Sequence, residues 1–168
     1  VCETGLYYPV SNFQGGLKAE LLEKELDSLG RTLEDMLIDF DIVDDDVIQT
    51  AEITDGYMHI GRAKYKNIII PEEAYIPDAT GKALKDFVRC GGRVTHEFTN
   101  LTSVIEAEGN GLRAMHRKAE NADVFCLFRE IGENGNYKIN LPSSTGYLLD
   151  LQNGVLQRLQ TANGVFNV

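Results

Sequence analysis

The sequence lacks any extended basic cluster. Its 16 lysine and arginine residues are outnumbered by 26 aspartate and glutamate residues, which gives a formal net charge of −10. The longest basic run is His116-Arg117-Lys118. Nucleic acids and anionic membrane surfaces both require a positively charged footprint on the protein. We therefore expect neither nucleic acid nor a membrane as a partner, whereas a neutral ligand such as a sugar is compatible with the acidic surface.

Cysteine is scarce as well, and its three copies, Cys2, Cys90 and Cys126, lie far apart in the sequence. An odd number in a domain of this size argues against a disulfide framework. Cys126 lies within the apolar run from 124 to 128, so we expect it to be a small residue of the core.

Long apolar runs are missing too, because no segment approaches the ~18 residues of a membrane-spanning helix. There is no signal-peptide pattern, and the chain begins at Val1 without an initiator methionine. We interpret it as an excised segment. Hydrophobic residues make up 43% of the 168 residues, enough for a packed core in one domain or in a domain plus part of another.

Two short β-branched runs, Phe40–Val43 and Asn67–Pro71, are bounded by turn or charged residues. This pattern is typical of strands that are buried on both faces. Helical patterns over residues 17–37 and 77–90 separate the runs from each other and from further strands, so the strands are predicted to be parallel. The other strands expected in this α/β sheet cover residues 5–10 and 93–98.

Local signals refine this prediction. Asp44-Asp45-Asp46 is typical of a helix start, and Thr54-Asp55-Gly56 predicts a hairpin turn. Gly91-Gly92 is expected to end the second long helix, and Gly30 to kink or break the first. The polar stretch 11–16 is expected to be a loop.

After Gly109 the pattern changes from βα units to hairpins. We therefore predict an α/β domain over residues 1–109 and a β-rich extension or partial β-sandwich over residues 110–168. The expected strands of the second part cover residues 112–118, 123–129, 137–141, 146–151 and 155–159, with a turn at 132–135.

Several segments together resemble a known architecture. They are IDFDIVDDDVI (38–48), DGYMHIGRAKYKNIIIP (55–71), CGGRV (90–94), LRAMHRKAENADVFCLFRE (112–130) and GYLLDLQNGVLQRL (146–159). In this order they resemble the glutamine-amidotransferase-like domain of multidomain bacterial glycoside hydrolases of the α-L-rhamnosidase and β-galactosidase types, together with the strands that follow it.

The resemblance implies a flavodoxin-like three-layer sandwich with a mostly parallel sheet. It also implies an accessory domain beside a separate catalytic barrel that holds the catalytic acids. The expected partners are then the other domains of the parent enzyme, with a homo-oligomer and a carbohydrate as further options. The compartment stays open between the bacterial cytoplasm, the periplasm and secretion.

Amidotransfer or a related hydrolysis would need a nucleophile at a sharp strand-to-helix turn. The last predicted strand of the sheet is followed by Thr99-Asn100-Leu101, with no cysteine and no G-x-S-x-G pattern. Cys90 belongs to the end of the preceding helix. We therefore interpret Cys90 as structural and predict no catalytic residue in this chain.

In an open α/β sheet the ligand crevice lies at the carboxyl ends of the strands. Tyr8, Glu72, Glu73 and Glu97, with Tyr75 nearby, are the polar residues best placed for such a crevice. They are the candidate binding residues, although carboxylates in solvated loops are the simpler explanation. Paired acids for glycoside hydrolysis are not evident from abundance alone.

No cofactor or metal is expected. His59, His96 and His116 fall on separate predicted strands without ligand spacing. Gly15-Gly16 precedes the first long helix, but a G-x-G-x-x-G or Walker motif is missing, so a plain loop is the better interpretation.

Three functional hypotheses follow. The first is a non-catalytic accessory domain of a glycoside hydrolase in carbohydrate metabolism, supporting the barrel, the oligomer or the sugar cleft. The alternative is a stand-alone flavodoxin-like small-molecule binder or hydrolase. The third is an interaction module that docks a partner through Glu20, Glu23 and Asp27.

Overall fold

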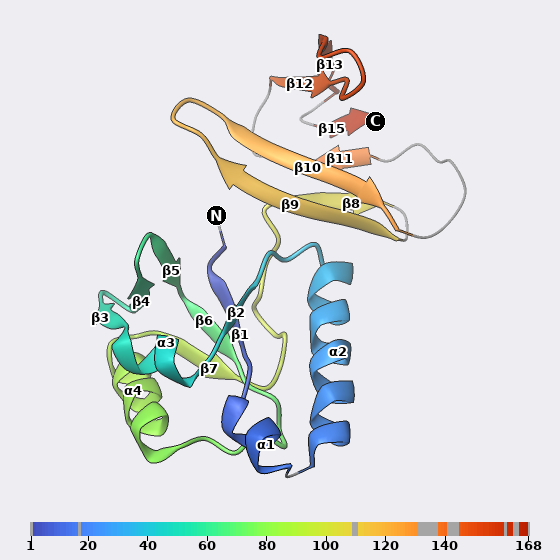
Figure 1. Cartoon of the computed structure of the whole chain (residues 1–168). Helices are drawn as coiled ribbons and strands as arrows, with labels where there is room; N and C mark the ends of the chain where they lie inside the picture. The colour runs from blue at the N-terminus through green and yellow to red at the C-terminus, as the bar shows by residue number, and fades with distance from the viewer. Residues whose placement is uncertain are drawn as a thin grey trace.

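The computed structural model shows an α/β body built on a parallel sheet (Figure 1). It describes residues 2–16, 18–108, 111–130, 138–140, 145–159, 161–162 and 165–167. The sheet contains four strands in the order β2-β1-β6-β7, and every neighbouring pair is parallel. The strands are β1 (Thr4–Tyr7), β2 (Asp41–Val43), β6 (Asn67–Ile69) and β7 (Arg93–Thr95). The prediction of parallel strands in an α/β fold is thus confirmed.

Helices cover both faces of this sheet (Figure 1). On one face, α2 (Ala19–Asp35) packs Leu29 and Leu33 against Leu6 and Ile69. On the other face lie α3 (Asp45–Thr50) and α4 (Asp78–Arg89). Their core residues Ile48, Leu84 and Phe87 pack with the sheet residues Tyr7, Val43 and Ile68.

Burial on both faces was predicted for β2 and β6, and the structure shows it only for β6. In β6, Ile68 and Ile69 point to opposite faces and both are fully buried. In β2, Val43 is buried but Ile42 is 57% exposed. The prediction was wrong for β2 because this strand lies at the edge of the sheet, where α2 does not cover the side chain of Ile42.

Two local predictions for the first part of the chain were also wrong. Residues 11–16 are not a loop, because α1 spans Val10–Gly15 and ends at Gly16 with a φ of +66°. Its buried Asn12 accepts a hydrogen bond from the main-chain N–H of Tyr75, a tertiary contact that local sequence does not reveal. Gly30 does not interrupt α2, which runs through it and places Gly30 beside Phe40. Leu17 lies outside the described residues.

The predicted start of α3 is confirmed, because the Asp44 side chain accepts a hydrogen bond of 2.9 Å from the Val47 N–H. We expect Asp44→Ala to lower the free energy of unfolding by about 1 kcal/mol through loss of this N-cap. Urea denaturation followed by circular dichroism measures the change. Asp46→Ala is the matched control, because Asp46 is an exposed first-turn acid, and an equal loss for both variants would contradict the capping role.

The hairpin predicted around residues 54–56 is confirmed and continues into a third strand. The antiparallel strands are β3 (Glu52–Thr54), β4 (Tyr57–Ile60) and β5 (Ala63–Tyr65). Asp55 and Gly56 both have positive φ, as a two-residue hairpin turn of type I′ requires. Met58 of β4 is fully buried and joins the core beneath α3 and α4.

The C-terminal part consists of antiparallel strands. The strands β9 (Leu112–Lys118) and β10 (Asp123–Arg129) form the hairpin that the sequence predicts. A further sheet has the order β14-β15-β11-β8, and β12 pairs with β13. Their bounds are β8 (Glu106–Glu108), β11 (Lys138–Asn140), β12 (Gly146–Leu149), β13 (Leu156–Leu159), β14 (Thr161–Ala162) and β15 (Val165–Asn167).

The strands β8, β14 and β15 had not been predicted from the sequence. The domain junction near Gly109 and the turn at 132–135 fall outside the described residues. The boundary at 109 therefore stays a prediction.

Arg113 joins the C-terminal hairpin to the α/β body. Its guanidinium lies 2.7 Å from Asp35 and 3.5 Å from Glu34 at the end of α2, and 2.8 Å from Glu130 after β10. Acidic residues at the carboxyl end of a helix oppose its dipole, so Arg113 offsets an unfavourable charge arrangement.

The prediction of Cys126 as a core residue was wrong, because its side chain is exposed. Strand β10 alternates between two faces, and Phe125 and Leu127 point toward the small core formed with Ile105 and Leu112. Cys126 therefore falls on the opposite, solvent-facing side of the hairpin.

Candidate functional site

A buried hydrogen-bond network occupies the carboxyl edge of the parallel sheet. Its centre is Asp45, the first residue of α3, which is only 8% exposed. The Tyr7 hydroxyl donates to Asp45 Oδ1 at 2.7 Å, and the Thr80 hydroxyl donates to the same oxygen at 2.6 Å. Ser11 donates to Oδ2 at 3.3 Å. The network thus joins β1, α1, α3 and α4.

In this network the buried hydroxyls of Tyr7 and Thr80 act as hydrogen-bond donors to Asp45. Burial, reinforced by the hydrogen bond to Asp45, raises the pKa of Tyr7 well above its usual range. Tyr7 and Thr80 are both fully inaccessible to solvent. Thr80 also accepts a hydrogen bond from Gln49 Nε2 at 2.9 Å. The Tyr7 and Thr80 hydroxyls and the Asp45 carboxylate thus all have hydrogen-bond partners within the protein, as is typical of polar groups in a structural core.

The residues predicted for the crevice take up separate contacts near this edge. Tyr8 is 37% exposed and stacks on Phe13, with ring centroids 4.9 Å apart. Tyr75 is 58% exposed. The carboxylate of Glu97 accepts a hydrogen bond from Thr99 at 3.3 Å.

The loop with Glu72 and Glu73 is tied to α2 instead. The Glu25 carboxylate accepts hydrogen bonds from the main-chain N–H groups of Glu72 at 2.5 Å and Glu73 at 3.4 Å. Glu73 forms an ion pair with Lys18. Among the described residues, no hydrogen bond or ion pair links Glu97 to either of these two acids. The predicted crevice residues are therefore not gathered into one paired-acid site.

The positions where an α/β hydrolase would carry its nucleophile hold other residues. Strands β1, β2, β6 and β7 are followed directly by Tyr8, Asp44, Ile70 and His96. The His96 ring nitrogen Nδ1 lies 2.7 Å from the carbonyl oxygen of Ile70, so this histidine ties β7 to the end of β6. Cys90 follows α4 and is exposed.

The three histidines lie on different parts of the molecule. His59 belongs to β4, His96 follows β7 and His116 belongs to β9. Within the part of the chain that the structure describes, no three His, Cys, Asp or Glu residues are grouped to hold a metal ion. No helix in the described ranges has the length and apolar character that a membrane-crossing segment requires.

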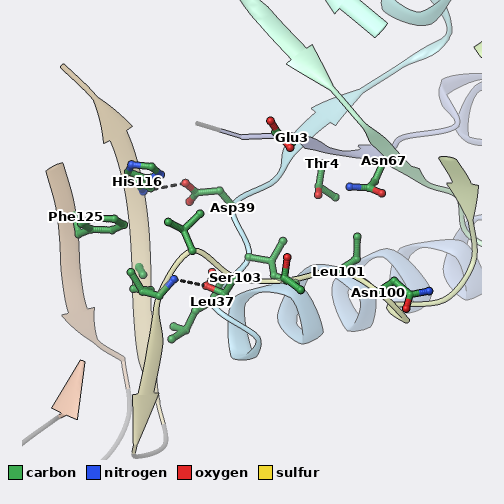
Figure 2. A pocket seen from close by; sticks show the side chains of 15 residues that line it. Glu3, Thr4, Leu37, Asp39, Asn67, Asn100, Leu101, Ser103, His116 and Phe125 are labelled. Carbon is green, nitrogen blue, oxygen red and sulfur yellow. Dashed lines mark hydrogen bonds between the residues drawn. The ribbon is translucent and has the colours of Figure 1, made fainter. Parts of the chain in front are cut away.

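A cavity of about 280 Å³ lies at the opposite, amino-terminal edge of the sheet (Figure 2). It is bordered by the α/β body, the segment from 100 to 105, and the β9–β10 hairpin. Its polar residues include Glu3, Thr4, Asp39 and Asn67. The sequence did not indicate this site, although the amino ends of parallel strands meet at one edge and three of these residues lie at or near strand starts.

His116 forms the wall of the cavity on the hairpin side. Its main-chain N–H donates to Asp39 Oδ2 at 2.8 Å, and its ring stacks on Phe125 with centroids 4.4 Å apart. The ring nitrogen Nε2 lies 2.8 Å from Asp123 Oδ1. These contacts hold the imidazole in a defined orientation beside the cavity (Figure 2).

Cys2 lies close to this edge, and its thiol donates to the carbonyl oxygens of Thr4 at 3.1 Å and Asp39 at 3.4 Å. Burial, reinforced by the nearby charge of Asp41, raises the pKa of the Cys2 thiol to about 12. At neutral pH it is therefore a protonated, unreactive thiol.

We expect iodoacetamide at pH 8 to alkylate Cys2 about tenfold or more slowly than the exposed Cys90 and Cys126, because the thiolate is the reacting species. Peptide mass spectrometry over a time course measures the three rates. In urea the three rates should become similar. Equal rates in the folded protein would contradict the burial of Cys2.

Comparisons of the chain with protein-family models, with curated proteins and with solved structures found no match. A functional proposal therefore rests on the resemblance of short sequence segments and on the geometry of the residues.

Proposed function

We propose that this chain is a non-catalytic accessory module of a larger bacterial glycoside hydrolase, with a flavodoxin-like α/β body and a β-rich extension. The proposal starts from the resemblance of the segments 38–48, 55–71 and 90–94 to the glutamine-amidotransferase-like domains of such enzymes. In that arrangement the module supports the catalytic barrel, the oligomer or the sugar cleft.

The strand order supports the flavodoxin-like assignment. Counting only the parallel strands along the chain, the order across the sheet is second, first, third, fourth. Flavodoxin-like folds have the order 2-1-3-4-5, so these four strands follow its first four positions. Helices on both faces of the sheet support the same assignment.

The observation that carries the proposal is that the polar side chains at the carboxyl edge of the sheet form hydrogen bonds and ion pairs within the protein. Enzymes of this architecture bind their ligands in a crevice at that edge. Here Asp45, Tyr7 and Thr80 use their polar groups on one another inside the protein. Glu73 pairs with Lys18 and Glu97 bonds to Thr99, and among the described residues no hydrogen bond or ion pair joins Glu72, Glu73 and Glu97 into a pair of catalytic acids.

Exposed apolar side chains on the C-terminal hairpin support a role inside a larger assembly. Tyr147 and Leu156 of β12 and β13 are 59% and 64% exposed, and Leu151 in the turn is 85% exposed. A cluster of large apolar side chains on a surface commonly marks a protein interface. The other domains of the parent enzyme, or a second copy of the chain, would cover it.

Hydrolysis assays test the proposal. We expect the purified chain to release no 4-nitrophenol above the buffer rate from a panel of 4-nitrophenyl glycosides, including α-L-rhamnoside and β-D-galactoside. Within the full reading frame, hydrolysis should come from the barrel. Glu72→Gln and Glu97→Gln should then leave kcat unchanged, because neither acid would touch the substrate's reacting atoms.

The opposite result is equally well defined. Turnover that follows the chain through purification and disappears in Glu72→Gln, Glu73→Gln or Glu97→Gln would refute the accessory role. Glu120→Gln is the matched control, since Glu120 is an exposed acid in the β9–β10 turn. A contaminating hydrolase would act equally in all four variants.

A further inference from the structure

We propose that the cavity at the amino-terminal edge of the sheet binds a neutral, polyhydroxylated small molecule the size of a monosaccharide. This inference does not rest on the proposed function, because it concerns the edge opposite to the Asp45 network and depends only on the groups that surround the cavity.

Several polar side chains at this edge face the cavity without a protein partner. Thr4 is only 4% exposed, yet its hydroxyl has no hydrogen-bond partner among the described residues. The Asn67 amide and the Glu3 carboxylate are likewise unpaired within the described part of the chain. Figure 2 shows Thr4, Asn67 and Asp39 around one space. Because these side chains line the cavity and keep free hydrogen-bonding capacity, they indicate a site for a polar ligand.

The chemistry of these groups determines the class of ligand. The carboxylates of Glu3 and Asp39 accept hydrogen bonds, so the ligand must bring donors and cannot be an anion. Thr4 and Asn67 both donate and accept. An ammonium ion would satisfy the carboxylates but would offer no acceptor to the Asn67 amide. Hydroxyl groups, which donate and accept, satisfy all four side chains.

Part of the cavity lining is apolar. Leu37, Leu101 and Ile105 line it, and Figure 2 shows Leu37 on the side away from Thr4 and Asn67. A sugar or cyclitol ring matches this division, because its hydroxyls can face the polar residues while its C–H surface packs on the leucines. The volume of about 280 Å³ is close to the lower end of ligand pockets, ~300 Å³, so a single ring fits better than an oligosaccharide.

An NMR titration of the ¹⁵N-labelled chain tests the inference, with D-glucose, D-galactose, D-mannose and myo-inositol as probes in the millimolar range. We expect at least one of them to shift the amide signals of Thr4, Asn67 and Ser103 with a single saturating isotherm. Glu3→Gln and Thr4→Val should each weaken this affinity about tenfold, equivalent to about 1.4 kcal/mol. Glu97→Gln makes the same chemical change at the opposite edge and should leave the affinity unchanged.

Three results would overturn the inference. They are no shift with any of the four probes, binding of putrescine without binding of a polyol, and sugar-induced shifts at Tyr8 and Glu97 in place of Thr4 and Asn67. If Thr4→Val fails to fold, Glu3→Gln still decides the question, because Glu3 is only partly buried and its carboxylate has no partner within the described residues.

Discussion

Gly92→Ala is expected to lower the free energy of unfolding by about 3 kcal/mol. A Cβ atom at this position would lie 2.0 Å from Cε2 and 2.3 Å from Cδ2 of the Phe87 ring. Phe87 is fully buried in the core between α4 and the sheet, so the ring can move only by disturbing that core. Forcing extra volume into a packed core typically costs about 1–3 kcal/mol, and this contact is severe.

The close approach at Gly92 comes from the way in which α4 ends. The Gly92 N–H donates to the Phe87 carbonyl oxygen at 2.9 Å, and the Gly91 N–H donates to that of Val88 at 3.0 Å. With Gly91 at a φ of +94°, this is a Schellman motif, which folds the chain back over the last turn. Gly92 is thereby pressed onto the ring of the residue that accepts its hydrogen bond.

Gly30→Ala is the matched control with the opposite sign. Gly30 lies inside α2, and its added Cβ would meet Phe40 Cζ at 3.5 Å, an ordinary contact. We expect a gain of about 0.5–1 kcal/mol, because alanine is the better helix former. Urea denaturation of both variants measures the difference. A loss smaller than 1 kcal/mol for Gly92→Ala would contradict the packing described for Phe87.

Asp45→Ala is expected to cost about 3 kcal/mol or more. The substitution removes the acceptor of two fully buried hydroxyls, those of Tyr7 and Thr80. A buried group left without a partner costs about 1–3 kcal/mol, and the two losses occur together. Thermal and urea denaturation give the change in the free energy of unfolding.

Tyr7→Phe is the control for this substitution. It removes one hydroxyl and keeps the ring in the core, so we expect a loss of only about 1 kcal/mol. Stability that is unchanged or raised in Asp45→Ala would contradict a structural role. A polar group that is kept for catalysis or binding often lowers the stability of the fold, so replacing it often raises the free energy of unfolding.

The fold could be predicted from the sequence where local pattern and tertiary environment agree. The run at 67–70 is buried on both faces in the structure because β6 is central, and the signals at Asp44 and at 54–56 correspond to a cap and a turn. The prediction failed where the position of a strand at the sheet edge, or a contact with a residue far away in the sequence, determines the structure. Ile42 is exposed at the sheet edge, and α1 is held by Asn12 through Tyr75, 63 positions away.

The candidate sites were harder to predict for a related reason. Sequence reasoning placed Glu72, Glu73 and Glu97 at the carboxyl edge, but it could not show that Glu25 and Lys18 engage the first two. The hydroxyls of Tyr7 and Thr80 lie 38 and 35 positions from Asp45, so their convergence depends on the packing of α3 and α4. The cavity needs the β9–β10 hairpin as a wall, which no local pattern supplies.

A double-mutant cycle between Tyr7 and Asp45 tests most directly whether the carboxyl edge of the sheet is a structural network. The free energies of unfolding of the wild type, Tyr7→Phe, Asp45→Ala and the double variant give the coupling energy of the pair. The buried hydrogen bond of 2.7 Å predicts a coupling of about 1.5–3 kcal/mol, as for a hydrogen bond to a charged group. Additivity of the two single changes to within about 0.5 kcal/mol would contradict the account.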